Sequence, residues 1–128
     1  MSYYVLDASA LMALLHEEPG NDKVVQAVKD GAAISTVNLS EVASKLGELG
    51  TPEALIQDAI NVLKLTIVDF NTEFAYKVGL LRPLTKHAGL SLGDRACLAL
   101  AQHLNLPALT TDRVWQDLSL DVTVQLIR

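Results

Sequence analysis

Short apolar runs alternate with longer segments of helical periodicity along this chain, and a turn or cap signal stands at almost every boundary. The short runs predict strands at 3–6, 33–36, 66–68, 108–111 and 122–127, the last as an edge strand. The helical spacing predicts helices at 9–16, 22–30, 39–49, 52–63, 72–81 and 92–104. Strands that are separated by helices join through right-handed crossovers, so the pattern predicts an α/β fold: a three-layer α/β/α sandwich with a mostly parallel sheet.

Most of the predicted helices begin after a residue whose side chain can cap the first turn. These predicted N-caps are Asn21 or Asp22, Asn38, Thr51 (followed by Pro52), Asn71 and Ser91. With 128 residues and neither a linker nor a repeat, the chain is expected to form one domain, 1–128.

Composition narrows the class of protein. Half of the residues are hydrophobic and 20% are charged, which excludes a disordered or fibrous chain. The single cysteine, Cys97, excludes an internal disulfide framework and a multi-cysteine zinc site. The N-terminal residues do not resemble a signal peptide, and no apolar run is long enough to span a membrane, so we expect a cytoplasmic protein without a membrane partner.

The formal net charge of -5 argues against a broad basic surface for nucleic acid, unless the acids gather in one place to hold cations. Asp7 and Asp112 directly follow the first and fourth predicted strands, while Glu41 and Asp94 each lie three residues after a predicted cap. Parallel strands all end at one edge of the sheet, so these four acids, the acidic quartet, are expected to meet there.

Each acid of the quartet also has a purely structural explanation. Carboxylates in a first helical turn complement the helix dipole and form capping boxes, and a carboxylate after a strand commonly caps the next helix. Four such groups in one crevice would repel one another unless cations neutralised them. Carboxylate oxygens suit Mg²⁺ or Mn²⁺, and such ions promote phosphodiester hydrolysis, with the hydroxyls of Ser9 and Thr111 as supporting groups.

Four segments around these acids are similar to a known family: DASAL at 7–11, NLSEV at 38–42, LSLGDRACLALA at 90–101 and LTTDRVW at 109–115. They resemble the four acidic motifs of PIN-domain ribonucleases, and more narrowly those of the VapC-type toxins of bacterial toxin–antitoxin pairs. The resemblance implies a PIN-like fold and a Mg²⁺- or Mn²⁺-dependent endoribonuclease in which the quartet is catalytic. It also implies a homodimer and a VapB-type antitoxin that blocks the site.

Further residues have two interpretations each. Arg82, Lys86 and Arg95 are expected either to contact RNA phosphates or to belong to a solvated face. Asp117, five residues after Asp112, is either an auxiliary acid of the site or a surface residue, and the surface interpretation is favoured. The apolar stripe of the helix at 52–63 is wider than one packing face needs, which favours a dimer or antitoxin surface.

Three other functions compete with the nuclease. A phosphatase of the haloacid dehalogenase kind needs an acid where this chain has Ser9, and it needs a lysine late in the chain beside the site. A response-regulator receiver needs an acidic pair at the first strand, and that pair is absent here. A non-catalytic module of α/β fold that binds metal or protein remains the alternative to the ribonuclease.

Overall fold

The computed structural model describes residues 1–128 and contains a five-stranded sheet in the order β3-β2-β1-β4-β5. Every strand pair is parallel, with Val5 paired to Ala33 on one side and to Ala108 on the other. The strands are β1 (Tyr4–Leu6), β2 (Ala32–Ser35), β3 (Thr66–Val68), β4 (Ala108–Thr110) and β5 (Val124–Leu126). The predicted parallel sheet is confirmed, and the last apolar run forms an edge strand.

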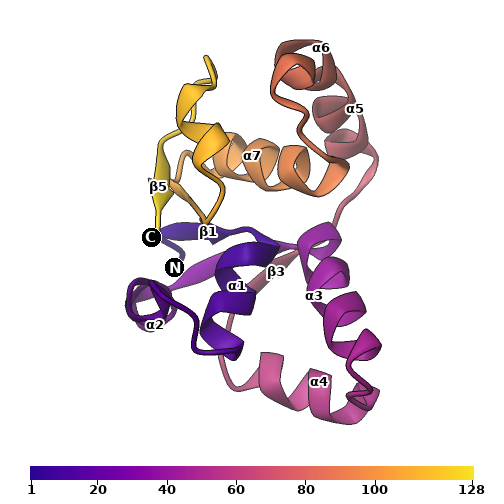
Figure 1. Cartoon of the computed structure of the whole chain (residues 1–128). Coiled ribbons are helices and arrows are strands. Elements are labelled where there is room, and N and C mark those ends of the chain that lie inside the picture. Colours follow the sequence, from indigo (N-terminus) through magenta and orange to yellow (C-terminus); the bar gives the residue numbers. More distant parts are fainter.

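Helices cover both faces of this sheet (Figure 1). They are α1 (Ala8–Leu15), α2 (Asn21–Asp30), α3 (Thr36–Glu48), α4 (Glu53–Asn61), α5 (Thr72–Leu80), α6 (Arg82–Thr85) and α7 (Leu92–Leu104), with short 3-10 helices η1 (Lys86–Ala88) and η2 (Arg113–Asp117). Helices α5 and α7 lie on one face, while α1 and α2 lie on the other. The three-layer α/β/α prediction is therefore confirmed. None of the helices combines the length and the apolar character that crossing a membrane requires.

Alternation along the strands divides the core between the two faces. Val5 and Ala33 pack with α5 and α7, whereas Leu6 and Ile34, their neighbours along the strands, face α1 and its surroundings. The sheet-facing side of α7 is rich in alanine, which allows this helix to lie close to the strands. Buried α7 thus holds a fixed position across β1, β2 and β4.

The chain leaves β1 and enters β4 on opposite faces of the sheet, although these two strands are neighbours. Such a reversal opens a crevice at the carboxyl ends of the two strands, where α/β proteins bind their ligands. Asp7 stands directly after β1, and Thr111 and Asp112 stand directly after β4. The topology therefore places these residues at the crevice.

The prediction that Asn38 caps a helix is wrong. Helix α3 begins at Thr36, and Ser35 caps it by accepting a hydrogen bond from the backbone N–H of Val37 at 3.2 Å. Ser35 is the last residue of β2, so the helix starts directly at the strand end. Asn38 consequently lies inside α3 and is free to make contacts between helices.

Two further predicted caps are also wrong. Helix α2 begins after Gly20, whose φ of 90° is left-handed, and no side chain caps it. Asn21 instead donates its side-chain N–H to the carbonyl of Glu18 at 2.7 Å. Helix α4 begins at Glu53, with Pro52 and not Thr51 at the cap position. The predicted caps Asn71 and Ser91 are confirmed, Ser91 with a complete capping box to Asp94.

Candidate functional site

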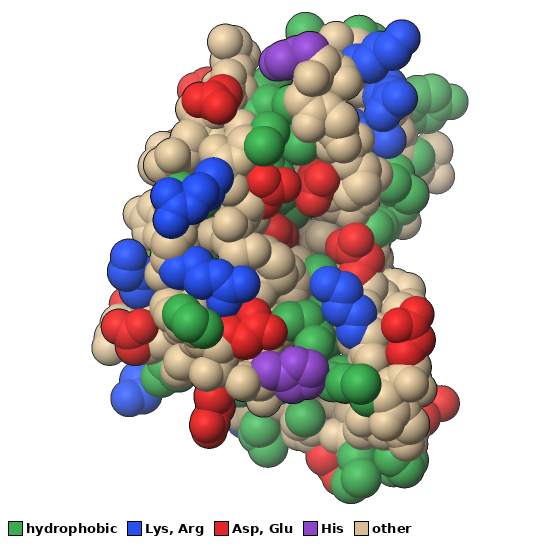
Figure 2. Space-filling model, viewed as in Figure 1, with side chains coloured by type: hydrophobic (Ala, Val, Ile, Leu, Met, Phe, Trp, Pro, Cys, Tyr) green, Lys and Arg blue, Asp and Glu red, His purple; other side chains and the backbone are tan.

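All four members of the acidic quartet line one cleft of about 310 Å³, which we call the acidic cleft. Their elements are the β1–α1 junction, α3, α7 and the loop after β4. Acidic side chains gather near the middle of the face shown in Figure 2, with Lys and Arg side chains around them. The cleft is also lined by Ala8, Ser9, Asn38, Lys45 and Thr111.

Asp7 is the most deeply placed acid of the quartet, with 4% of its surface exposed. Its Oδ1 accepts hydrogen bonds from the Ser9 hydroxyl at 2.7 Å and the Ala10 N–H at 2.8 Å, and its Oδ2 accepts one from the Thr110 hydroxyl at 2.6 Å. Burial raises the pKa of Asp7 from 3.8 to about 6, and the charge of Asp94 adds to this rise, although the three hydrogen bonds oppose it.

Hydroxyl groups tie the end of β4 to the start of α1. The Ser9 Oγ accepts the Thr111 N–H at 3.0 Å, and the Thr110 Oγ1 accepts the Asp112 N–H at 3.0 Å. Ser9 therefore hydrogen-bonds both the Asp7 carboxylate and the backbone after β4. Thr111 contributes its backbone N–H, and the hydroxyl that reaches Asp7 belongs to its neighbour Thr110, which is fully buried.

Glu41 is held between α3 and the first turn of α7. The side-chain N–H groups of Asn38 donate to Glu41 Oε1 at 2.9 Å and to the Gly93 carbonyl at 3.0 Å. A Cβ added to Gly93 would collide with the Glu41 carboxylate, so a glycine is needed at this close approach. Neither role is visible in the sequence, because Asn38 resembles a helix cap and Gly93 is a single glycine in a predicted helix.

Asp94 and Asp112 both act as local caps. Asp94 Oδ2 accepts the Ser91 N–H at 2.9 Å, and Asp112 Oδ1 accepts the Val114 N–H at 3.0 Å. Both acids thus have the structural role of a helix cap that the sequence suggested. Each still has a second carboxylate oxygen that makes no hydrogen bond to the protein, as does Glu41.

The carboxylates of the acidic quartet suit a hard divalent cation as ligands. Their ligand atoms are all oxygens, which Mg²⁺ and Mn²⁺ prefer. Asn38, which is 1% exposed, has an Oδ1 without any hydrogen-bond partner, and its amide orientation is fixed because both of its N–H partners are acceptors. A buried acceptor without a donor is consistent with a cation or its water ligands nearby. No three Asp, Glu, His or Cys side chains lie in the arrangement of a formed metal site.

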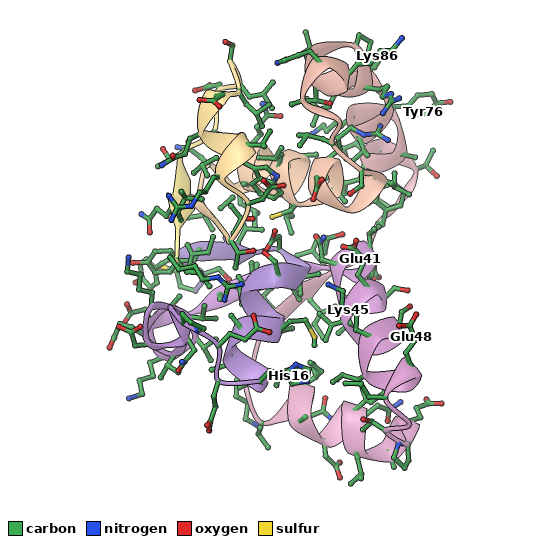
Figure 3. All side chains as sticks on the ribbon, in the orientation of Figure 1. His16, Glu41, Lys45, Glu48, Tyr76 and Lys86 are labelled. Carbon is green, nitrogen blue, oxygen red and sulfur yellow. The ribbon has the colours of Figure 1, made fainter.

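The basic residues predicted to contact RNA lie elsewhere. Arg82, Lys86 and Arg95 do not line the acidic cleft, and Lys86 lies at the far end of the molecule, beside α6 (Figure 3). Arg95 donates to the carbonyl of Val78 in α5 at 3.0 Å, so its guanidinium is engaged within the fold. Asp117 is exposed and does not line the cleft either.

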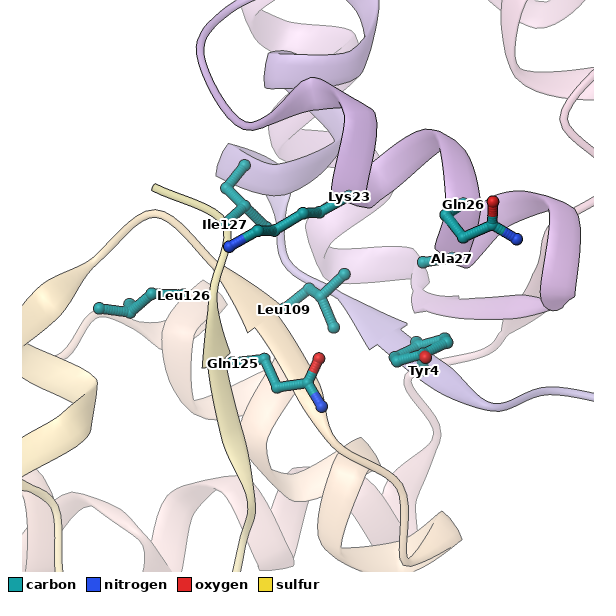
Figure 4. A pocket seen from close by; sticks show the side chains of 8 residues that line it. All are labelled: Tyr4, Lys23, Gln26, Ala27, Leu109, Gln125, Leu126 and Ile127. Carbon is teal, nitrogen blue, oxygen red and sulfur yellow. The ribbon is translucent and has the colours of Figure 1, made fainter.

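A separate cavity of about 210 Å³ lies between α2 and the strands β4 and β5 (Figure 4). Its polar lining comes from Lys23, Gln26 and Gln125, together with Tyr4. It contains no carboxylate, so it offers no anionic ligand to a metal cation, unlike the acidic cleft.

Comparisons with solved structures identify the same fold in toxin–antitoxin proteins. The VapBC complex of Salmonella typhimurium bound to DNA superposes with a TM-score of 0.77 at 16% identity, covering 100% of both chains. VapBC2 of Rickettsia felis, bound to a promoter fragment, gives a TM-score of 0.72 at 17% identity, covering 97% of this chain and 98% of that one. VapBC-1 of nontypeable Haemophilus influenzae gives 0.72 at 19% identity and covers 98% of each chain.

No curated protein matches this sequence closely enough to count as a relative. The family model of the PIN domain matches residues 4–119, which contain the whole acidic quartet and every helix and strand except β5. This match confirms the resemblance to PIN-domain proteins that the four motifs suggest. The chain belongs to the PIN domain family.

Proposed function

We propose that this PIN-domain protein is a Mg²⁺- or Mn²⁺-dependent endoribonuclease and the toxin of a VapBC-type toxin–antitoxin pair. The observation that carries this proposal is the acidic cleft, in which four carboxylates from four distant segments meet at the carboxyl edge of a parallel sheet. Membership of the PIN domain family and the fold shared with VapBC proteins support it. We place the activity in the cytoplasm.

The acidic quartet would hold the metal, and Asn38 would position the Glu41 carboxylate for it. A bound Mg²⁺ or Mn²⁺ supplies an activated water and neutralises charge on the phosphate. The chain itself provides the rigid frame. Three hydrogen bonds fix the Asp7 carboxylate, and Asn38 fixes that of Glu41 against α7. Such outer hydrogen bonds set the direction in which each ligand oxygen points.

Cleavage of a panel of structured transfer and ribosomal RNAs tests the proposal. We expect cleavage with Mn²⁺ or Mg²⁺, none with chelator, and a loss of more than about 100-fold in Asp94→Asn, because removing a ligand carboxylate costs more than the 10- to 100-fold typical of outer-shell partners. The capping bond to Ser91 can be kept by asparagine, so the fold should survive. Cleavage that persists in Asp94→Asn would remove this residue from the site.

The cleavage assay together with calorimetry distinguishes the nuclease from a non-catalytic module. A non-catalytic module that binds metal or protein would take up Mn²⁺ in calorimetry and cleave none of the RNAs. The nuclease requires both binding and cleavage.

An antitoxin would need an apolar surface on this protein. The groove between α3 and α4, of about 550 Å³, is lined by Leu39, Ile56, Ile60 and Ile67. On α4, Leu55 is 58% exposed, whereas Ile60 is buried and Ile56 packs against the core, so the predicted apolar stripe is covered in part and leaves Leu55 for a partner. We assign this groove to the VapB-type antitoxin.

The proposed homodimer would use a different surface. Tyr76 and Leu80, one turn apart on α5, are 71% and 72% exposed, and Leu84 on α6 is 59% exposed. We expect a dimer by light scattering at micromolar concentration, and we expect Leu80→Glu to give a monomer because a charge in an apolar interface is costly. Leu55→Glu on α4 is the control and should stay dimeric. A monomeric wild-type protein would contradict the prediction.

A further inference from the structure

Lys45 is the only basic residue among those that line the acidic cleft. It lies on α3 four residues after Glu41, so both side chains stand on the same face of the helix, and Figure 3 shows them next to each other. Lys45 is exposed and takes part in neither of the two ion pairs of the structure, Lys77–Glu73 and Arg128–Glu18. Its ammonium group is therefore available to a ligand.

A second cavity, of about 430 Å³, continues from the acidic cleft along the space between α1 and α3. The two cavities share Ser9, Lys45 and Thr111, so together they form one groove with Lys45 at the junction. His16, at the end of α1, lines the second cavity and is exposed. Arg128 and Glu18 also line it and form an ion pair at 3.1 Å, and Glu48 of α3 adds one further carboxylate to the lining.

A strand of RNA that enters the acidic cleft must bring more than one phosphate near four carboxylates. Bound metal neutralises charge at the reacting phosphate, whereas the neighbouring phosphates need a cation from the protein. Because the chain has a net charge of -5, RNA binding depends on where a basic side chain lies relative to the cleft. Lys45 alone meets this requirement within the cleft, and its long, flexible stem lets the ammonium reach along the groove.

We propose that Lys45 binds a phosphate of single-stranded RNA adjacent to the one that is cleaved, and that the strand leaves the acidic cleft along the groove between α1 and α3, past His16. This inference rests on the proposed function and specifies the path of its substrate. It replaces the path that the sequence suggested, along Arg82, Lys86 and Arg95, because none of those residues lines either cavity.

Fluorescence anisotropy with a labelled single-stranded RNA tests this path, with Ca²⁺ in place of Mg²⁺ or Mn²⁺ so that the carboxylates are neutralised while no cleavage is expected. We expect Lys45→Ala to weaken binding about tenfold and to lower the slope of log affinity against log salt by about 0.7, the value for one phosphate contact to a single strand. Lys45→Arg should keep most of the affinity, because the charge remains. Lys86→Ala is the matched control and should bind as the wild type does.

Two measurements separate Lys45 from the metal site. In the cleavage assay, Lys45→Ala should raise KM with little change in kcat, and calorimetry should find its Mn²⁺ affinity undiminished, since it removes a cation and no ligand. Loss of Mn²⁺ binding would instead make Lys45 part of the frame that holds Glu41, and would overturn the proposal.

The remaining outcomes distinguish the two proposals. If Lys86→Ala weakens binding and Lys45→Ala does not, the RNA follows the other face and the inference is wrong, while the nuclease stands. If Lys45→Ala weakens binding but the wild type cleaves no RNA with either ion, the binding site stands and the nuclease fails. A wild-type protein that binds no RNA would overturn the inference directly.

Discussion

Replacement of Asp7 by asparagine is expected to abolish metal-dependent RNA cleavage and, at the same time, to stabilise the metal-free protein. Asparagine has the same shape and can keep the hydrogen bonds that Oδ1 accepts from Ser9 and Ala10. It lacks the negative charge that a divalent cation needs, so cleavage should fall by more than about 100-fold. Stability should rise because a buried charge that burial disfavours has been removed.

The direction of the stability change follows from the raised pKa of Asp7. Because this pKa is 3.8 in the unfolded chain and about 6 in the folded protein, the folded state binds the proton more tightly. Lowering the pH from 7 through 6 therefore favours the folded state, and the gain is complete below about pH 4. It amounts to at most roughly 3 kcal/mol in the metal-free protein.

Thermal unfolding in chelator between pH 4 and pH 8 measures this effect. The contribution of Asp7 makes the wild type lose stability as the pH rises from 4 to 6, and Asp7→Asn should lack that contribution and have the higher Tm at pH 7. Asp117→Asn, an exposed acid outside the cleft, is the control and should follow the wild type. An Asp7→Asn protein that melts below the wild type at pH 7 would contradict the destabilising effect of burying the Asp7 charge.

Gly93→Ala is expected to impair the site while the fold stays intact. The added Cβ would collide with the carboxylate of Glu41, the mobile end of a flexible side chain, so the carboxylate moves and the backbone does not. Glu41 then loses its place beside Asn38, and we expect metal affinity and cleavage to fall about 10- to 100-fold. The free energy of unfolding should change little. Alanine is the better helix former by roughly 0.5–1 kcal/mol, and this gain offsets the cost of displacing the Glu41 carboxylate.

Gly47→Ala provides the matched control for this substitution. Gly47 is also a helical glycine, on α3, and a Cβ added there would meet no atom within 4 Å. This variant should gain a few tenths to about 1 kcal/mol in stability and keep wild-type cleavage and Mn²⁺ affinity. If Gly93→Ala also retains full activity, the packing of Glu41 against α7 is not required by the site.

The sequence alone determined the features that depend on neighbouring residues and on strand order. The caps Asn71 and Ser91 follow from side chains that bond an N–H only three residues away. The meeting of the four acids follows from the rule that parallel strands end at one edge, since Asp7 and Asp112 follow strands, and Glu41 and Asp94 belong to the helices that start near that edge. Neither inference needs the packing of side chains.

Tertiary structure decided the features that depend on which helices touch. Asn38 is a residue type that commonly caps helices, but Ser35 is the residue that caps α3. Because α3 packs against α7, the Asn38 side chain instead hydrogen-bonds Glu41 and the Gly93 carbonyl. Lys45 becomes part of the acidic cleft and Arg95 does not, although both follow an acid of the quartet in sequence. Periodicity predicts that a helix forms, whereas the neighbours that its faces meet are set by the packing of elements distant in the chain.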